Sequence, residues 1–291
     1  MTDSGPVLVV GGTGMLGSQV VSRLLTGGKQ VRALVRPGSD ASRLEEAGAT
    51  IARGDMMDPE SLARAMEGVD AVITSAAGYT HHREGDSTVI DTVGNINLVD
   101  AASRAGIRRF VLTSILTCDQ TPDLPHFWHK KLTEDRLEER GVPFVALRPG
   151  AFLDQITRFG DPFSEGRITW FGSSSVPLTF VLTRDLAGYL AAAVDASGVD
   201  GQRIDIGWDR PVTMQDIADI SAQMLGRQVQ LVVNPVNPIN PMAKDLGAMM
   251  DWFQTGRYVA DTSRQREVFG PPPSAEDAVA RLLTGLGHKL A

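Results

Sequence analysis

The sequence contains very little cysteine. Among its 291 residues Cys118 is the single cysteine, so no internal disulfide can form. No CxxC pair and no cluster of cysteine and histidine has the spacing of a zinc site, so we expect no bound metal. A chain without disulfides is typical of a reducing compartment, and we predict a cytoplasmic protein.

Long hydrophobic runs and an excess of positive charge are also absent. No apolar run approaches the roughly 20 residues that cross a bilayer, and residues 1–6 lack the basic start of a signal peptide. Asp and Glu number 35 against 28 Lys and Arg, and the net charge of −7 leaves no global positive field for nucleic acid. We therefore expect no membrane and no nucleic acid as partners. No heptad pattern marks an assembly surface, which leaves a monomer and a homodimer both open.

Short apolar runs alternate with amphipathic segments over the first half of the chain. Regular alternation of this kind indicates βαβ units. The fold class is therefore predicted to be α/β, with a doubly wound parallel Rossmann sheet over residues 1–150. The expected strands are residues 7–10, 31–35, 49–52, 69–73, 109–113 and 144–147. The expected helices are a segment that ends at Gly27 and residues 59–66, 89–105 and 126–140.

The pattern becomes irregular after Pro149 and Gly150. Residues 151–291 are predicted to form a smaller substrate-binding lobe, with a segment near residues 178–206 that returns to the core. Here we expect a helix over 186–194, a strand over 203–206, a helix over 213–225 that Thr213 caps, and a last helix from Ser274. Residues 234–241 contain three prolines and are expected to be irregular.

A glycine-rich segment between the first expected strand and helix is the most informative part of the sequence. Gly11 permits a tight turn, Gly14 lets the backbone approach a pyrophosphate, and Gly17 allows close packing of the helix. The start of the helix offers unpaired N–H groups to the anion. This context predicts a dinucleotide site. Its expected backbone contacts are Gly11, Thr13, Gly14, Met15, Leu16 and Gly17.

Residues after the next strands predict how the rest of a dinucleotide is held. Arg36 follows the second strand where an acidic residue would select NAD, so NADP is expected, with NAD possible. The alternative is that Arg36 is a solvated strand-end residue. Asp55 is placed at the adenine amine and Met56 against its ring. The small residues Ser75, Ala76 and Ala77 are expected where the ribose passes close to the backbone.

Several segments together resemble the NmrA-like branch of the atypical short-chain dehydrogenase/reductase family. They are residues 11–17, 33–37, 54–56, 101–111 and 147–152. The resemblance implies a Rossmann core that binds NAD(P) and a small C-terminal lobe that closes over the substrate. We place Pro149 and Phe152 of the last segment at the cofactor. The family includes reductases of quinones, flavins and isoflavonoids and also non-catalytic redox sensors, so membership alone leaves catalysis open.

The resemblance also predicts catalytic residues. Standard reductases of this superfamily use Ser together with Tyr and Lys in a YxxxK motif, but no tyrosine here has a lysine four residues later. His126 stands in the Tyr place, Lys130 in the Lys place, and Ser114 matches the Ser. A spacing of four places His126 and Lys130 on one helical face, and imidazole can donate to a carbonyl oxygen. The alternative is that His126 and His129 are surface residues and that Lys130 only contacts ribose hydroxyls.

The substrate is predicted from aromatic side chains on the expected pocket side. Tyr79 and His81 follow the fourth strand, where ligands lie in open α/β folds, and Trp128 and Phe152 add apolar surface. Packing of the lobe would explain such aromatic residues equally well. The leading hypothesis is an NAD(P)H-dependent oxidoreductase of a quinone, aromatic ketone or related polycyclic small molecule, with natural-product tailoring as one setting. The alternative is a non-catalytic NADP(H)-sensing regulatory protein.

Overall fold

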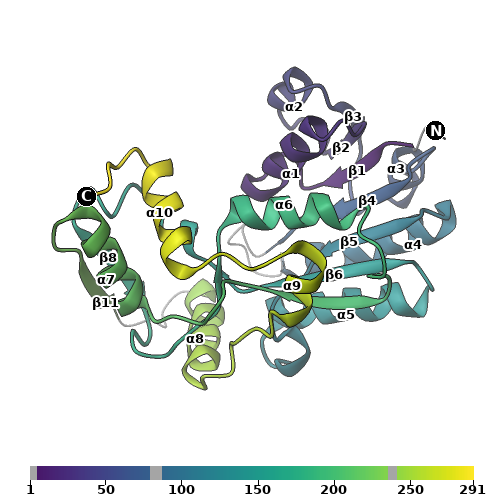
Figure 1. Cartoon of the computed structure of the whole chain (residues 1–291). Coiled ribbons are helices and arrows are strands. Elements are labelled where there is room, and N and C mark those ends of the chain that lie inside the picture. Colours follow the sequence, from purple (N-terminus) through teal and green to yellow (C-terminus); the bar gives the residue numbers. More distant parts are fainter. Residues whose placement is uncertain (1–4, 79–86, 235–240) are drawn as a thin grey trace. The chain divides into compact units, whose positions relative to one another are not determined.

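The computed structural model describes residues 5–78, 87–234 and 241–291 and contains a seven-stranded sheet (Figure 1). Its strand order is β10-β6-β5-β4-β1-β2-β3, and the pairs from β6 to β3 are parallel. The order reverses direction between β1 and β4, as in a Rossmann sheet. The predicted α/β fold is thus confirmed. The strands are β1 (Val7–Val10), β2 (Val31–Val35), β3 (Thr50–Arg53), β4 (Ala71–Thr74), β5 (Arg109–Thr113), β6 (Phe144–Pro149) and β10 (Gln202–Ile206).

Helices cover both faces of this sheet, because its strands carry apolar residues on both sides. One face packs against α3 (Pro59–Ala65), α4 (Asn95–Ala105) and α5 (Pro125–Glu139). Leu8, Phe110 and Leu137 belong to this core. In Figure 1, α1 (Met15–Thr26) and α6 (Thr183–Ala193) lie on the opposite face. A short helix, α2 (Ser42–Glu46), follows β2.

The expected helix over residues 89–105 is two elements. A π-helix, η2 (Ser87–Gly94), precedes α4, and η2 packs mainly against α5. The side chain of Asn95 explains the break, since its Nδ2 donates to the carbonyls of Ile90 at 3.1 Å and Asp91 at 3.4 Å. Side-chain donors to backbone carbonyls change the hydrogen-bonding pattern of a helix at the junction.

The chain divides into two compact units. The first comprises residues 1–148 and 184–204, and the second comprises residues 149–183 and 205–291. The second unit contains two pairs of parallel strands, β7 (Ala151–Phe152) with β9 (Phe180–Val181) and β8 (Arg167–Phe171) with β11 (Gln230–Asn234).

Four helices and two short 3₁₀ turns complete the description. In the second unit, α7 (Met214–Leu225) begins with the predicted cap, in which Thr213 Oγ1 accepts from Asp216 N at 2.9 Å. The other helices are α8 (Pro241–Gln254), α9 (Ser263–Phe269) and α10 (Ala275–Gly285), and the 3₁₀ turns are η3 (Cys118–Gln120) and η4 (Leu153–Thr157). Most of the expected irregular stretch near Pro238 lies outside the described residues.

Candidate active site

The loop between β1 and α1 has the backbone conformation that a diphosphate site requires. Gly11 has a φ of +85°, which favours glycine, and its carbonyl accepts from Gly14 N at 3.0 Å. A Cβ at position 17 would lie 2.1 Å from the Gly11 carbonyl oxygen, so α1 can pack here only with Gly17. Gly14 caps α1 without a side-chain hydrogen bond, and the first turn holds no acidic residue. The N–H groups and the positive end of the helix dipole therefore remain for an anion.

The remaining loop positions differ in exposure. Thr13 and Met15 are exposed at the start of α1, Leu16 is half-buried, and Gly17 is buried. Thr13 and Met15 are therefore accessible, and their contact with a ligand stays a prediction, whereas Gly17 allows helix and loop to approach each other.

Arginines surround the loop that follows β2. Arg36 is exposed at the end of the strand, as expected. Arg53 ends the neighbouring strand β3, and its Nη1 donates to the carbonyls of Ser39 at 2.7 Å and Arg36 at 3.4 Å. Arg53 therefore braces the loop that carries Arg36, a role that sequence reasoning missed. The nearby Asp40 has a lowered pKa, chiefly because its carboxylate accepts hydrogen bonds from Ser42.

The two residues predicted at the adenine occupy different environments. Asp55 is half-buried, and its Oδ1 accepts from Met57 N at 2.9 Å. Met56 is buried in the core between the sheet and α3 and α4, and its carbonyl accepts from Asn97 Nδ2 at 3.0 Å. The sheet core accounts for most of the Met56 surface, so its contact with an adenine ring stays a prediction.

The end of β4 lies against the glycine loop. Ser75 Oγ donates to Val10 O at 3.3 Å. A Cβ on Gly11 would lie 2.8 Å from Ser75 Oγ. Ser75, Ala76 and Ala77 are all half-buried. The small side chains predicted for a passing ribose therefore follow β4 beside the loop.

His126 lies near the start of α5 and is buried, with 4% of its surface exposed. It is thus not a surface residue. Burial, with smaller contributions from the positive charges of His129 and Lys130, lowers the pKa of His126 to about 4. The imidazole is therefore neutral at pH 7. Its ring meets Phe127 edge-on, with 4.6 Å between centroids.

Lys130 is held by two acceptors, one just after β4 and one in η2. Its Nζ donates to the carbonyl oxygen of Ala76 at 3.1 Å and to Asp91 Oδ1 at 3.2 Å. Both charged side chains are buried, with 6% of Lys130 and 1% of Asp91 exposed. Sequence reasoning missed Asp91, although a lone carboxylate inside the apolar stretch of residues 89–93 was a usable signal.

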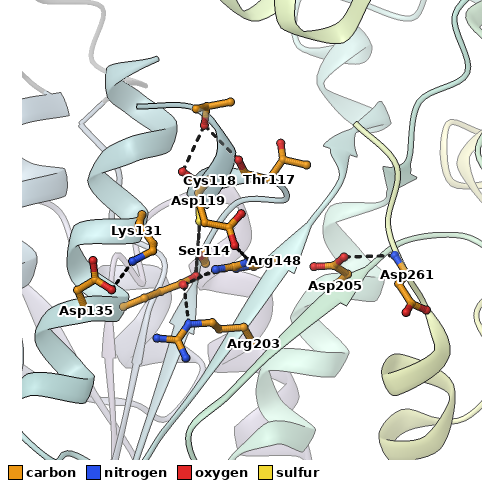
Figure 2. A network of polar contacts seen from close by, with 12 residues as sticks. Ser114, Thr117, Cys118, Asp119, Lys131, Asp135, Arg148, Arg203, Asp205 and Asp261 are labelled. Atoms are coloured by element: carbon orange, nitrogen blue, oxygen red, sulfur yellow. Dashed lines mark hydrogen bonds and ion pairs between the residues drawn. The ribbon is translucent and has the colours of Figure 1, made fainter. Parts of the chain in front are cut away.

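Ser114 belongs to a buried ionic network rather than presenting a free hydroxyl. Its Oγ donates to Glu134 Oε1 at 2.6 Å. Arg148 binds both oxygens of the same carboxylate at 3.0 and 2.6 Å, and Arg203 Nε approaches it at 3.0 Å. Figure 2 shows Ser114, Arg148 and Arg203 converging. A hydroxyl has one hydrogen, so the Ser114 donor is committed to Glu134, a residue whose place four after Lys130 puts it on the same face of α5.

The thiol of Cys118 in this network is unreactive at neutral pH. Cys118 lies in the turn η3, with Sγ 3.6 Å from both Ser114 Oγ and Glu134 Oε1. Burial, together with the nearby Glu134 charge, raises the pKa of the thiol to about 12. Because the thiolate is the nucleophile, this cysteine is unsuited to covalent chemistry.

The other predicted site residues are placed only in part. Trp128 is half-buried on α5. Pro149 and Phe152 lie in the second unit, where the Pro149 carbonyl accepts from Tyr258 Oη at 3.4 Å and Phe152 is half-buried in β7. Tyr79 and His81 lie outside the described residues.

Neither a metal cluster nor a membrane span emerges from the part of the chain that the structure describes. No three side chains of His, Cys, Asp or Glu are grouped there to hold a metal ion. None of the described helices combines the length and apolar character that crossing a bilayer would demand.

Solved structures of similar fold include reductases. Triphenylmethane reductase of Citrobacter sp., complexed with NADP(H), superposes with a TM-score of 0.78 at 23% identity over 96% of this chain and 100% of that chain. The quinone oxidoreductase QOR2 of Escherichia coli, complexed with NADPH, gives 0.77 at 21% identity over 95% and 99%. At this identity the likeness establishes the fold, and the cofactor in both structures accords with the predicted NADP(H).

Curated relatives have more varied roles. Photosystem II assembly factor Ycf39 of Synechocystis sp. is 32% identical over 92% of this chain and 86% of the relative. An NAD(P)H azoreductase of Xenophilus azovorans is 27% identical over 78% and 76%. The sequence model of the NmrA-like family matches residues 3–269. With a Rossmann sheet, a glycine-rich loop after its first strand and a match over nearly its whole length, the chain belongs to the NmrA-like family.

Proposed function

We propose that this protein is an NADP(H)-dependent oxidoreductase that reduces a quinone or a related conjugated aromatic small molecule. One observation carries the proposal. The ammonium of Lys130 donates to the carbonyl oxygen of Ala76, just after the end of β4. The preceding residue, Ser75, borders the glycine loop. A cation is thus held close to the place where the loop would bind a dinucleotide.

The residues of the first unit divide the task of cofactor binding. Backbone N–H groups that follow Gly14 in the first turn of α1 would hold the diphosphate, and Arg36, with the loop braced by Arg53, would bind the 2′-phosphate. When bound, NADPH supplies a hydride to the substrate. The protein supplies position and charge.

His126 and Lys130 would act on the substrate oxygen. A neutral imidazole offers one N–H donor, which would orient a quinone or ketone oxygen. The Lys130 ammonium would stabilise negative charge that develops on that oxygen, in a site from which water is largely excluded. Ser114 contributes differently from our expectation, because its proton is already donated to Glu134.

The choice of substrate class is supported by the relatives. The names of one sequence relative and two fold relatives describe reduction of azo compounds, triphenylmethane compounds and quinones, all of which contain conjugated rings or bonds. The half-buried Trp128 on the same helix as His126 gives an aromatic surface suited to such a ligand.

A second candidate is a protein that binds NADP(H) without turnover and regulates a partner. Two observations favour it. The tyrosine of a YxxxK motif, which would donate the proton, is missing, and the Ser114 hydroxyl donates to Glu134 instead. The similarity to Ycf39, whose name describes assembly rather than catalysis, is consistent with this reading.

Absorbance at the nicotinamide band, with quinones and azo and triphenylmethane dyes as acceptors, distinguishes the two candidates. We expect wild type to consume NADPH with at least one acceptor. Lys130→Met should lower kcat by about 100-fold or more because it removes the cation, and His126→Phe by about 10-fold. Calorimetry with NADPH alone provides the control for cofactor binding. Tight binding without consumption of NADPH by any acceptor would contradict catalysis and favour the regulatory protein.

A further inference from the structure

The buried carboxylate of Asp91 forms an ion pair with the proposed catalytic lysine. It lies in the π-helix η2, is 1% exposed, and pairs with Lys130 Nζ at 3.2 Å. An isolated buried charge is strongly unfavourable, so the two groups depend on each other. We propose that Asp91 is a positioning residue that sets the direction of the Lys130 ammonium toward the ligand. This inference rests on the function proposed above.

Counting hydrogen-bond donors explains how direction is set. An ammonium carries three N–H donors. Within the described residues, two of them are taken by Asp91 Oδ1 and Ala76 O. Two fixed acceptors leave one N–H, whose direction then follows from the positions of the other two. If Asp91 were lost, the flexible four-carbon side chain could rotate and that direction would no longer be defined.

Asp91 is itself fixed by contacts with the site's own elements. Its backbone carbonyl accepts from Thr133 Oγ1 on α5 at 3.3 Å and from Asn95 Nδ2 at 3.4 Å. Asn95 Oδ1 in turn accepts from Thr74 Oγ1 at the end of β4, also at 3.4 Å. A closed circuit therefore runs from β4 through Asn95 and Asp91 to Lys130 and back to β4. Because η2 packs against α5, the carboxylate of Asp91 lies opposite Lys130 of that helix.

Stability alone is a poor explanation for this pair. Buried ion pairs often contribute little, because removing both charges from water opposes their attraction. Asp100 of α4, the helix that continues η2, also joins this region to α5, because it pairs with Arg136 and Arg140 at 2.9 Å each. Asp100 thus offers a matched control, since it links α4 to α5 without contacting Lys130.

The first test separates orientation of Lys130 from binding and folding. Asp91→Asn keeps the shape and an oxygen acceptor but removes the charge, and Asp91→Ala removes the acceptor. With an acceptor that wild type reduces, we expect kcat to fall by about 10-fold for Asp91→Asn and about 100-fold for Asp91→Ala, as misplaced catalytic groups do. The calorimetric Kd for NADPH should change less than kcat, and Asp100→Asn should leave kcat within about 2-fold.

In a Lys130→Met background, Asp91→Asn should have no further effect on kcat, because the group that it positions is gone. Equal and independent losses in both backgrounds, or a normal kcat in Asp91→Ala with Lys130 intact, would overturn the proposal.

A second measurement works even if no substrate is turned over. Acetylation of lysines, followed by mass spectrometry, reports how freely each amine reacts. In wild type we expect Lys130 to be acetylated much more slowly than the partly exposed Lys29. In Asp91→Ala the acetylation rate of Lys130 should rise at least 5-fold, while the rate of Lys29 should stay unchanged. The melting temperature of Asp91→Ala, compared with that of Asp100→Asn, reports whether the variant is folded. An unchanged Lys130 rate in a folded Asp91→Ala protein would overturn the inference. Absence of NADPH consumption in wild type would instead remove the proposed catalytic function and leave this result standing.

Discussion

Cofactor preference is decided at the scale of single residues, at the ends of β2 and β3. Arg36 is exposed, and Arg53 secures its loop through Ser39 O and Arg36 O. We expect Arg36→Ala to weaken NADPH binding by about 10-fold to 100-fold, since a charge-assisted bond to the 2′-phosphate is lost. The Kd for NADH, which lacks that phosphate, should stay within about 2-fold in calorimetry. Arg53→Lys keeps the charge but loses the planar fork, and should show a smaller loss of the same kind.

The control for this pair is Arg104, an exposed arginine in the last turn of α4. Arg104→Ala should leave both dissociation constants unchanged. Equal losses of NADPH and NADH affinity in Arg36→Ala would show that the arginine supports the fold of the loop rather than the 2′-phosphate.

Residue chemistry could be predicted where the sequence stated it directly. Gly11 and Gly17 occupy the conformations that their spacing predicted, because only glycine fits the positive φ and the 2.1 Å approach. The four-residue spacing of His126 and Lys130 did bring them onto one helix. Asp91 could not be predicted in the same way. Its partnership with Lys130 spans 39 residues and depends on a π-helix that apolar periodicity does not reveal.

At the scale of elements, Glu134 fastens α5 to the sheet. Its carboxylate accepts a hydrogen bond from Ser114, just after β5, and pairs with Arg148 of β6 and Arg203 of β10. The side chain of Glu134 has no exposed surface. Together with the apolar packing of Leu137, the network therefore holds the helix that carries Lys130 against the sheet. Sequence patterns predicted both the helix and the strands, but not this bond between them, because it joins residues up to 69 apart.

Glu134→Gln should consequently destabilise the protein. The substitution keeps the shape but leaves the buried Arg148 without most of its compensating charge, which costs about 3–5 kcal/mol when a buried pair is broken. Urea unfolding measures the free energy of unfolding. Glu139→Gln, which removes an exposed partner of Arg136 on the same helix, should change it by less than about 1 kcal/mol. A Glu134→Gln protein as stable as Glu139→Gln would show that hydrogen bonding, not charge, holds α5.

At the scale of the whole molecule, the buried His126 couples the stability of the fold to pH. Its pKa is about 4 in the folded state, against 6.5 for a solvated histidine. Between these values the unfolded chain binds the proton and the folded protein does not, so stability is fully present above pH 6.5 and falls as pH drops toward 4. The difference amounts to about 2 kcal/mol between pH 7 and pH 5.

Other groups titrate over the same range, so the effect of His126 must be isolated by difference. His126→Phe removes the titrating ring and keeps a planar apolar side chain, while His129 and His288 remain in both proteins. We expect the free energy of unfolding, measured in urea at pH 7 and at pH 5, to fall about 2 kcal/mol less for His126→Phe than for wild type. Parallel losses in the two proteins would mean that His126 accepts a proton in the folded state. A protonated imidazole could then donate a proton to the substrate near neutral pH, whereas a neutral His126 only donates a hydrogen bond.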